Sequence, residues 1–258
     1  MQLTPSGGGG GGKKNPFVTG LRSAVGLLAV AASGFGSVAF GGEAEKELVP
    51  VVEAEPGLPP SDAIVLFDGS EASFRKNWGG MTKTNSWVVK DGTLTVRPGA
   101  GYIYTHQGFR DCQLHIEWRT DEARVSKGQG RGNSGVIFMG GAHEVQVLDS
   151  FENPTYSKGQ AGAVYGKWAP QVNPMRKPGE WQVYDIVFHA PTWDGATLKD
   201  AGSMTVFFNG VLVQDHVALA TADQPPKRKP SESLVLQDHG CPVPFRNIWI
   251  RRLPKVGK

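Results

Sequence analysis

The 258-residue chain has only two cysteines, Cys112 and Cys241. They can form at most one disulfide, so a fold stapled by several bridges is excluded. Their pairing stays open, because one bridge suits an oxidising compartment and buried free thiols are common core residues. The chain also lacks Cys-x-x-Cys and His-Glu-x-x-His segments, and its six His residues are scattered. No zinc site is indicated.

Other signatures of cofactor and nucleophile chemistry are missing too. The glycines of residues 128–135 are not followed by the Lys-Ser/Thr of a phosphate-binding loop. No Gly-x-Ser-x-Gly turn is present, which excludes the serine hydrolases that depend on it. We predict no cofactor. A divalent cation remains possible, because the side-chain oxygens of Asp149, Glu152 and Asn153 are close in sequence.

Acidic residues are absent from residues 1–39, which hold three of the 27 basic residues. The rest of the chain therefore carries 24 charges of each sign, and no basic surface for nucleic acid is expected. Residues 1–39 have the layout of a signal peptide, with basic residues before the apolar run 24–39. That run falls short of the roughly 20 strongly apolar residues that a spanning helix prefers. We expect cleavage after Ala39, with an uncleaved anchor as the alternative.

Export then predicts a secreted or periplasmic protein without stable membrane insertion. Residues 40–61 are rich in Pro and Glu and indicate a linker. Residues 62–254 are expected to form one domain, and residues 255–258 a tail.

Long apolar stretches with helical periodicity are absent from that domain, whereas alternating apolar and polar residues recur. Asn209-Gly210 and Asp91-Gly92 each lie between alternating runs, as in two-residue hairpins. About ten strands without intervening helices favour an all-β sandwich or jelly roll over any βαβ fold.

Alternation also sorts side chains by sheet face. Gln113, His115, Glu117 and Arg119 share one face of their strand. Glu144 and Gln146 point away from the core in theirs, and Trp249 does so in a third. Such faces often simply meet solvent. Glu, His, Gln, Arg and Trp can, however, also hydrogen-bond hydroxyl groups and stack on a sugar ring. We expect one polar face that binds a sugar.

Seven ordered blocks carry a family resemblance. They are GNSGV, HEVQVLDSFENPTY, GQAGAVYG, RKPGEWQVYDIVFHAP, FFNGVLVQDH, LQDHG and FRNIWIRRL. In these blocks residues 64–253 resemble the 3-keto-disaccharide hydrolase domain family of the concanavalin A-like jelly-roll superfamily. The resemblance implies an exported bacterial enzyme with a jelly-roll β-sandwich of two antiparallel sheets. Relatives often carry an aromatic residue where His143 stands, which we interpret as a changed subsite.

The implied reaction cleaves the glycosidic bond of a sugar already oxidised at C3 by a separate sugar 3-oxidoreductase, its pathway partner. The ketone acidifies the C2 hydrogen, so the C1 substituent leaves by elimination and water then adds. Such a site needs a base, a donor to the C3 oxygen and an acid for the leaving group.

We assign the catalytic roles to residues of the two most distinctive blocks, EVQVLDS and QDHG. Glu144 is expected to be the base, and His239 the acid or electrophilic donor, oriented by Asp238 or Asp149. Substrate contacts are expected from Glu117, Arg119, Asn133 and Gln146, with Trp249 or Tyr165 as a stacking surface. The alternative function is a non-catalytic carbohydrate-binding module, because fold does not imply function.

Overall fold

The computed structural model describes residues 50–80, 87–123, 125–223 and 231–254, which belong to one compact unit, Pro50–Lys258. The expected signal peptide, the start of the linker and the tail lie outside the described residues. Within those ranges, no helix has both the length and the apolar character needed to cross a membrane.

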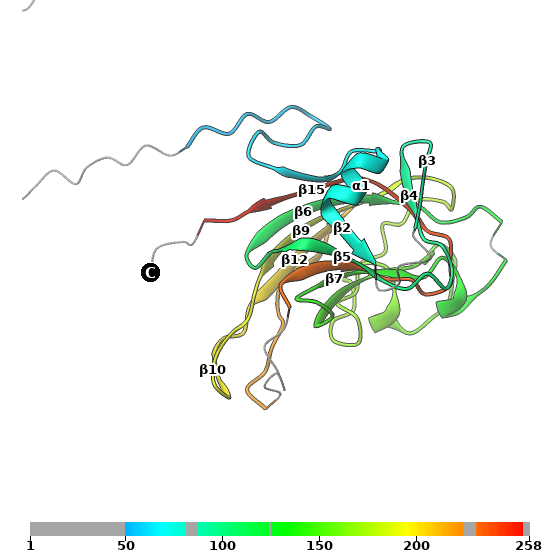
Figure 1. The fold of residues 1–258 in the computed structure, drawn as a ribbon. Coiled ribbons are helices and arrows are strands. Elements are labelled where there is room, and N and C mark those ends of the chain that lie inside the picture. The colour runs from blue at the N-terminus through cyan, green and yellow to red at the C-terminus, as the bar shows by residue number, and fades with distance from the viewer. Residues whose placement is uncertain (1–49, 81–86, 124, 224–230, 255–258) are drawn as a thin grey trace, which may run out of the picture. The chain divides into compact units, whose positions relative to one another are not determined.

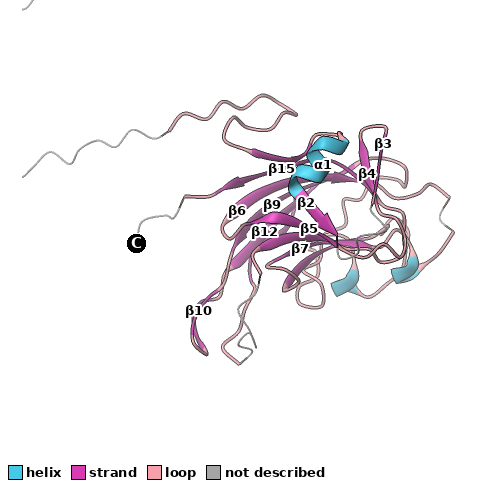
Figure 2. Ribbon diagram, in the orientation of Figure 1, coloured by secondary structure: helices cyan, strands magenta, loops and turns pink. Residues whose placement is uncertain are grey.

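The described chain is built almost entirely of strands (Figures 1 and 2). In chain order the elements are β1 (Ile64–Phe67), α1 (Glu71–Asn77), β2 (Trp78–Gly80), β3 (Val88–Lys90), β4 (Thr93–Thr95), β5 (Ile103–Gly108), β6 (Cys112–Trp118), η1 (Gly128–Gly130), β7 (Ser134–Phe138), β8 (His143–Val147), η2 (Ser157–Gly159), β9 (Gln182–His189), β10 (Thr192–Asp194), β11 (Thr197–Asp200), β12 (Ser203–Phe208), β13 (Val211–Ala218), β14 (Ser233–Leu236) and β15 (Pro244–Arg252).

Two antiparallel sheets form the sandwich, and β10 and β11 pair with each other as a separate two-stranded sheet. The larger has eight strands in the order β13-β12-β9-β6-β15-β4-β3, with β1 added beside β15. The smaller has the order β2-β5-β14-β7-β8. Figure 1 shows β15, β6, β9 and β12 side by side in one layer and β2, β5 and β7 in the other. This confirms the predicted jelly-roll β-sandwich of two antiparallel sheets.

The core lies between the sheets because most apolar residues of the strands point inward. In β6, Leu114, Ile116 and Trp118 are fully buried. The facing sheet contributes Val145 and Val147 of β8 to the same core. A ring contact joins the layers, since Phe138 of β7 stacks on Phe188 of β9 with ring centroids 4.5 Å apart. The strands' polar residues therefore point to two separate outer faces.

Both predicted hairpin turns are present. Asn209 and Gly210 have φ of 51° and 80° between β12 and β13. Asp91 and Gly92 have φ of 49° and 72° between β3 and β4. Positive φ at both central residues matches the right-handed twist of the flanking strands, which explains why Asn-Gly and Asp-Gly occur there.

One helix was not expected from the sequence. α1 has only seven residues, too few for a clear 3.6-residue apolar pattern. Its start is fixed by Ser70, whose hydroxyl accepts a hydrogen bond from the Ser73 amide at 3.0 Å. The helix packs against the core through Phe74, which is buried there.

The open question about the cysteines is answered: both are free thiols. Cys112 is fully buried in β6, and burial raises the pKa of its thiol to about 12. Cys241 lies in the loop before β15, where its thiol contacts the Gly130 carbonyl.

Candidate functional site

The expectation of a single polar face is wrong. Glu117 belongs to β6 of the eight-stranded sheet, whereas Glu144 belongs to β8 of the five-stranded sheet. Each points away from the core that separates the two sheets, so they lie on opposite sides of the sandwich. Alternation within one strand gives the face of a side chain, but it does not give the sheet to which the strand belongs. The predicted substrate residues are accordingly divided.

The outer face of the eight-stranded sheet holds a set of mutually paired groups. Glu117 accepts hydrogen bonds from Arg246 Nε at 2.6 Å and Asn247 Nδ2 at 2.9 Å. Burial alone would raise the pKa of Glu117, but these two partners outweigh it and lower that pKa. His115 Nδ1 lies 2.7 Å from Asp185 Oδ1. The charged groups of this face stabilise one another.

The aromatic residues of that face are also occupied. The ring of Trp249 stacks on His115 with centroids 5.1 Å apart, and only 6% of Trp249 is exposed. Arg119 lies over Trp181, with its guanidinium carbon 4.9 Å from the ring centroid, and Arg246 lies over the same ring at 4.0 Å. Trp249 therefore offers little free surface for stacking on a sugar.

The outer face of the five-stranded sheet carries the other candidates. Strand register places Val235 of β14 opposite Ile137 of β7, and Ile137 opposite Glu144 of β8. The segment after η2 then continues the sheet: Val164 bridges to Val145, and the Tyr165 amide donates to the Glu144 carbonyl at 3.0 Å. Glu144 thus stands between an apolar floor, Ile137 and Val235, and the aromatic ring of Tyr165.

Glu144 has an environment suited to proton transfer. Its carboxyl lies against Gly135 of β7, where a Cβ would sit 2.4 Å from Glu144 Oε1. Glycine at position 135 thereby makes room for the carboxyl group. Burial raises the pKa of Glu144 to about 7, because a partly dehydrated site disfavours the carboxylate. A carboxyl with a pKa near neutrality can act as base or acid at physiological pH.

Gln146 also contacts Glu144. Gln129 donates through Nε2 to the Gly159 carbonyl at 2.9 Å, so its own Oε1 must accept. The Gln146 amide meets that oxygen at 2.9 Å through Nε2. Its other end lies 3.1 Å from Glu144 Oε1 and 3.1 Å from the Ser134 carbonyl oxygen. The Gln146 amide therefore lies between Gln129 and Glu144 and contacts both side chains.

Two phenol groups complete this face. The hydroxyls of Tyr156 and Tyr165 lie 2.6 Å apart, and their rings meet edge to face. Half of Tyr156 and 43% of Tyr165 are exposed. The hydrogen bond with Tyr165, more than burial, raises the pKa of Tyr156 to about 12, and the charge of Glu144 adds to the shift. We call Glu144, Tyr156 and Tyr165 the acidic site.

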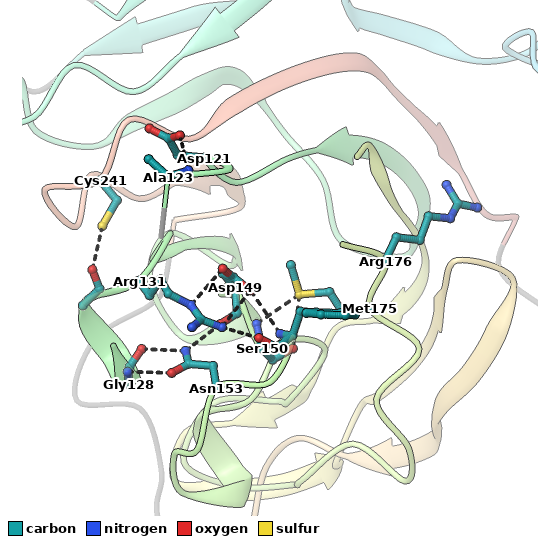
Figure 3. A network of polar contacts seen from close by, with 12 residues as sticks. Asp121, Ala123, Gly128, Arg131, Asp149, Ser150, Asn153, Met175, Arg176 and Cys241 are labelled. Atoms are coloured by element: carbon teal, nitrogen blue, oxygen red, sulfur yellow. Dashed lines mark hydrogen bonds and ion pairs between the residues drawn. The ribbon is translucent and has the colours of Figure 1, made fainter. Parts of the chain in front are cut away.

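Asp149 has a different role from the predicted one. It is fully buried, and its Oδ2 lies 2.8 Å from Arg131 Nε. Figure 3 shows the two side chains pointing toward each other beside Asn153, which bonds to both backbone groups of Gly128. The ion pair ties the segment after β8 to the loop before β7. Asp149 is thus a structural anchor, and its carboxylate pairs with Arg131.

Asn133 serves the same loop. It is buried, and its Nδ2 donates to the Gln129 carbonyl at 2.7 Å. Asn133 therefore shapes the loop that carries Gln129.

Asp238 and His239 lie in the loop after β14. Asp238 accepts the amides of Gly101 and Gly240, each at 2.9 Å, so it fixes the loop backbone rather than the imidazole. His239 is exposed, and its chemical role stays a prediction.

The interpretation of His143 as a changed subsite is wrong. It lies on the core side of β8, and its ring is 6.1 Å from that of Phe188. Burial, with the nearby charge of Lys167, lowers the pKa of His143 to about 4. The neutral imidazole acts as a core residue.

Sequence reasoning missed two residues of this face, Tyr156 and Gln129. Gln129 lies in η1 and Tyr156 directly before η2, outside any strand, so alternation gives no direction for either side chain. One signal was available for Tyr156, since it precedes Tyr165 in adjacent family blocks. For metal binding, the described ranges contain no group of three or more His, Cys, Asp or Glu side chains placed to hold an ion.

Comparison with solved structures places the fold among known proteins. The chain is 42% identical to a proposed glycosyl hydrolase from Parabacteroides distasonis ATCC 8503, with a TM-score of 0.74 over 82% of this chain and 94% of that chain. A second proposed glycosyl hydrolase from the same organism shares the fold at 19% identity, with a TM-score of 0.54 over 75% of this chain and 94% of that chain.

The curated proteins contain no match to the chain. A family model matches residues 62–251, which include every strand described above except the last residue of β15. With the 42% identical structure, this match makes the protein a glycosidase- or lyase-type enzyme. The chain belongs to the 3-keto-alpha-glucoside-1,2-lyase-like domain family.

Proposed function

We propose that the protein cleaves the glycosidic bond of 3-keto-glycosides by elimination followed by hydration, with Glu144 as the base. The observation that carries the proposal is Glu144 itself. It is partly buried beside Ile137 and Tyr165 on the outer face of the five-stranded sheet, and burial raises its pKa to about 7. The family description, a 3-keto-alpha-glucoside-1,2-lyase-like domain, supports the same substrate class.

The chemistry fits a single tuned carboxyl group. Glu144 removes the C2 proton, which the C3 ketone has made acidic, and the electrons of the C2–H bond form the C1=C2 double bond as the C1–O bond breaks. The departing oxygen takes up a proton. Water then adds to C1 and a proton returns to C2, which gives the free 3-keto sugar. An ordinary glycosidase needs two carboxyl groups at a set separation instead. In the acidic site, Glu144 is joined by two phenols.

The carboxylates that sequence analysis grouped with Glu144 lie elsewhere. Glu117 is on the opposite sheet, and Asp149 is held by Arg131. A paired-carboxylate mechanism through either residue is therefore disfavoured. Elimination with one base is the reaction that this face supports best. His239 remains our candidate for the donor to the C3 oxygen.

The test uses a matched pair of substrates, 3-keto-trehalose and trehalose. We expect release of glucose from the keto sugar only, since trehalose lacks the acidified C2 hydrogen. Glu144→Gln keeps the shape of the protonated side chain and should reduce turnover at least 100-fold, within the range for general-base catalysis. Binding of the keto sugar without any release would favour the carbohydrate-binding module, and near-normal turnover by the Gln variant would refute the role of Glu144.

We also propose an exported location and a pathway partner. The apolar run 24–39 after basic residues supports export. Because the substrate must already be a 3-keto sugar, a sugar 3-oxidoreductase has to act before this enzyme. Fractionation of the producing cell, with immunodetection of the processed chain, tests the location.

A further inference from the structure

The paired phenols of Tyr156 and Tyr165 are held in place by contacts of their rings and backbone. Their oxygens are 2.6 Å apart although both rings are exposed. Tyr156 packs its ring on Gly159, where a Cβ would lie 2.4 Å from Tyr156 Cε2. The Gly159 carbonyl accepts a hydrogen bond from Gln129 Nε2, and the Tyr165 backbone amide donates one to the Glu144 carbonyl. These contacts position the pair independently of a ligand.

Two phenols in contact have two protons, of which only one can lie between the oxygens. The second O–H must point away from the pair, toward solvent or a ligand. In a hydrogen-bonded chain the outward donor is strengthened by the inner bond. The pair therefore presents one polarised O–H donor within the acidic site.

We propose that the Tyr156–Tyr165 pair is the general acid that protonates the departing glycosidic oxygen. This inference rests on the proposed function and assigns the role that Glu144 leaves open. Strand register puts Tyr165 directly opposite Glu144. The carboxyl group of Glu144 leans the other way, onto Gly135 of β7. The base and the acid thus stand on the two sides of β8.

The proton balance closes with water as the only added reactant. The C2 proton goes to Glu144, the C1–O bond electrons go to the departing oxygen, and that oxygen takes the outward phenol proton. The inner proton of the pair is then shared with the resulting phenolate. Glu144 passes its proton through water to the phenolate, so that both groups regain their starting states before water adds to the enone.

The acidity of the pair suits this task. The pKa of Tyr156 is raised to about 12, so the phenol is protonated at every physiological pH. The departing sugar oxygen would be a strongly basic alkoxide if it left unprotonated, so it can take this phenol proton as the C1–O bond breaks.

The test compares leaving groups. Release of an alkyl alcohol from a 3-keto-glucoside needs an acid. The 4-nitrophenolate released from 4-nitrophenyl 3-keto-glucoside is a stable anion, so its departure does not need one. For Tyr165→Phe and Tyr156→Phe we expect kcat/KM to fall about 100-fold or more on the alkyl substrate. On the aryl substrate it should stay within about threefold of the wild-type value. The ratio between the substrates is the readout that a merely structural role would not move.

Tyr104→Phe is the matched control. It removes one exposed phenol hydroxyl on the same sheet face, on β5, and should leave the ratio at its wild-type value. Equal losses on both substrates, or no loss on either, would overturn the role of the pair while wild-type turnover still supports the function. Absence of wild-type turnover on both keto substrates would overturn the proposed function and the pair's role together.

Discussion

The carboxyl group of Glu144 occupies the space that a side chain at Gly135 would fill: a Cβ there would sit 2.4 Å from Glu144 Oε1. Gly135→Ala is therefore expected to displace the carboxyl group. The strand should survive, because the obstructing atoms belong to the end of a flexible side chain and not to backbone. We expect kcat to fall at least tenfold, as for a misplaced catalytic group, with the unfolding temperature nearly unchanged. Unaltered turnover would show that the carboxyl position does not matter.

The raised pKa of Glu144 predicts the pH dependence of turnover. The base is active when ionised, so kcat/KM should rise with pH and level off above an apparent pKa near 7. A profile already flat at pH 5 would contradict the assignment. Steady-state rates on 4-nitrophenyl 3-keto-glucoside between pH 5 and 9 provide the measurement.

The same shift makes a prediction about stability. A carboxyl group whose pKa is about 7 in the folded state and 4.5 by itself binds more protons folded than unfolded. The contribution of Glu144 to the free energy of unfolding is present below pH 4.5 and is lost as pH rises through 7. The free energy of unfolding of Glu144→Gln should therefore equal that of the wild type near pH 4. At pH 8 it should be higher than that of the wild type, by at most roughly 3 kcal/mol. Urea unfolding at both pH values measures the difference.

Asp149 is expected to matter for folding and not for proton transfer. Removal of its charge leaves Arg131 unpaired in a buried position, with a cost of about 3–5 kcal/mol. Asp149→Asn should lower the unfolding temperature. The folded variant should keep the wild-type dependence of kcat/KM on pH. A changed apparent pKa in a fully folded variant would restore a catalytic role for Asp149.

Glu117 provides a contrast, since it lies on the other sheet. Glu117→Gln should cost roughly 1–3 kcal/mol, because its partners Arg246 and Asn247 lose a charged acceptor. Its lowered pKa means that this stability is present above pH 4.5 and is lost as pH falls. Turnover at pH 8 should be unaffected. A large loss of activity in the folded variant would place substrate on that face after all.

The thiols supply a further check. In the native protein a thiol reagent should modify Cys241, which lines a surface pocket with Arg131 and Pro242. Cys112 should react only after unfolding, because it is fully buried and its thiol pKa is about 12. Two free thiols in denaturant, without prior reduction, are expected. A count of zero would show a disulfide instead.

The roles of individual residues were predictable to different degrees. Glu144 was selected from its strand because alternation pointed it away from Val145 and Val147, and the structure keeps it there. Glu117 was selected by the same logic and lies on the opposite side of the domain. Alternation fixes direction relative to a strand, but the pairing of distant strands fixes which face that direction meets.

Strand alternation could not predict the roles of loop residues. Asp149 looked like a catalytic or cation-binding group, and only the fold brings Arg131 within 2.8 Å of it. Tyr156 gained its significance from a hydroxyl contact with Tyr165 across η2. Long-range contacts of this kind depend on side-chain packing, for which the sequence carries no local period.

By itself, the sequence determined the all-β class, the two tight hairpin turns and the family, because period-2 alternation, Asn-Gly and Asp-Gly pairs and ordered blocks are local properties. The tertiary structure alone decided which sheet each polar face belongs to and which charges are paired. It also decided that Glu144 loses enough water for its pKa to approach 7. Desolvation and ion pairing are set by atoms distant in the chain, so these properties exist only once the two sheets have packed.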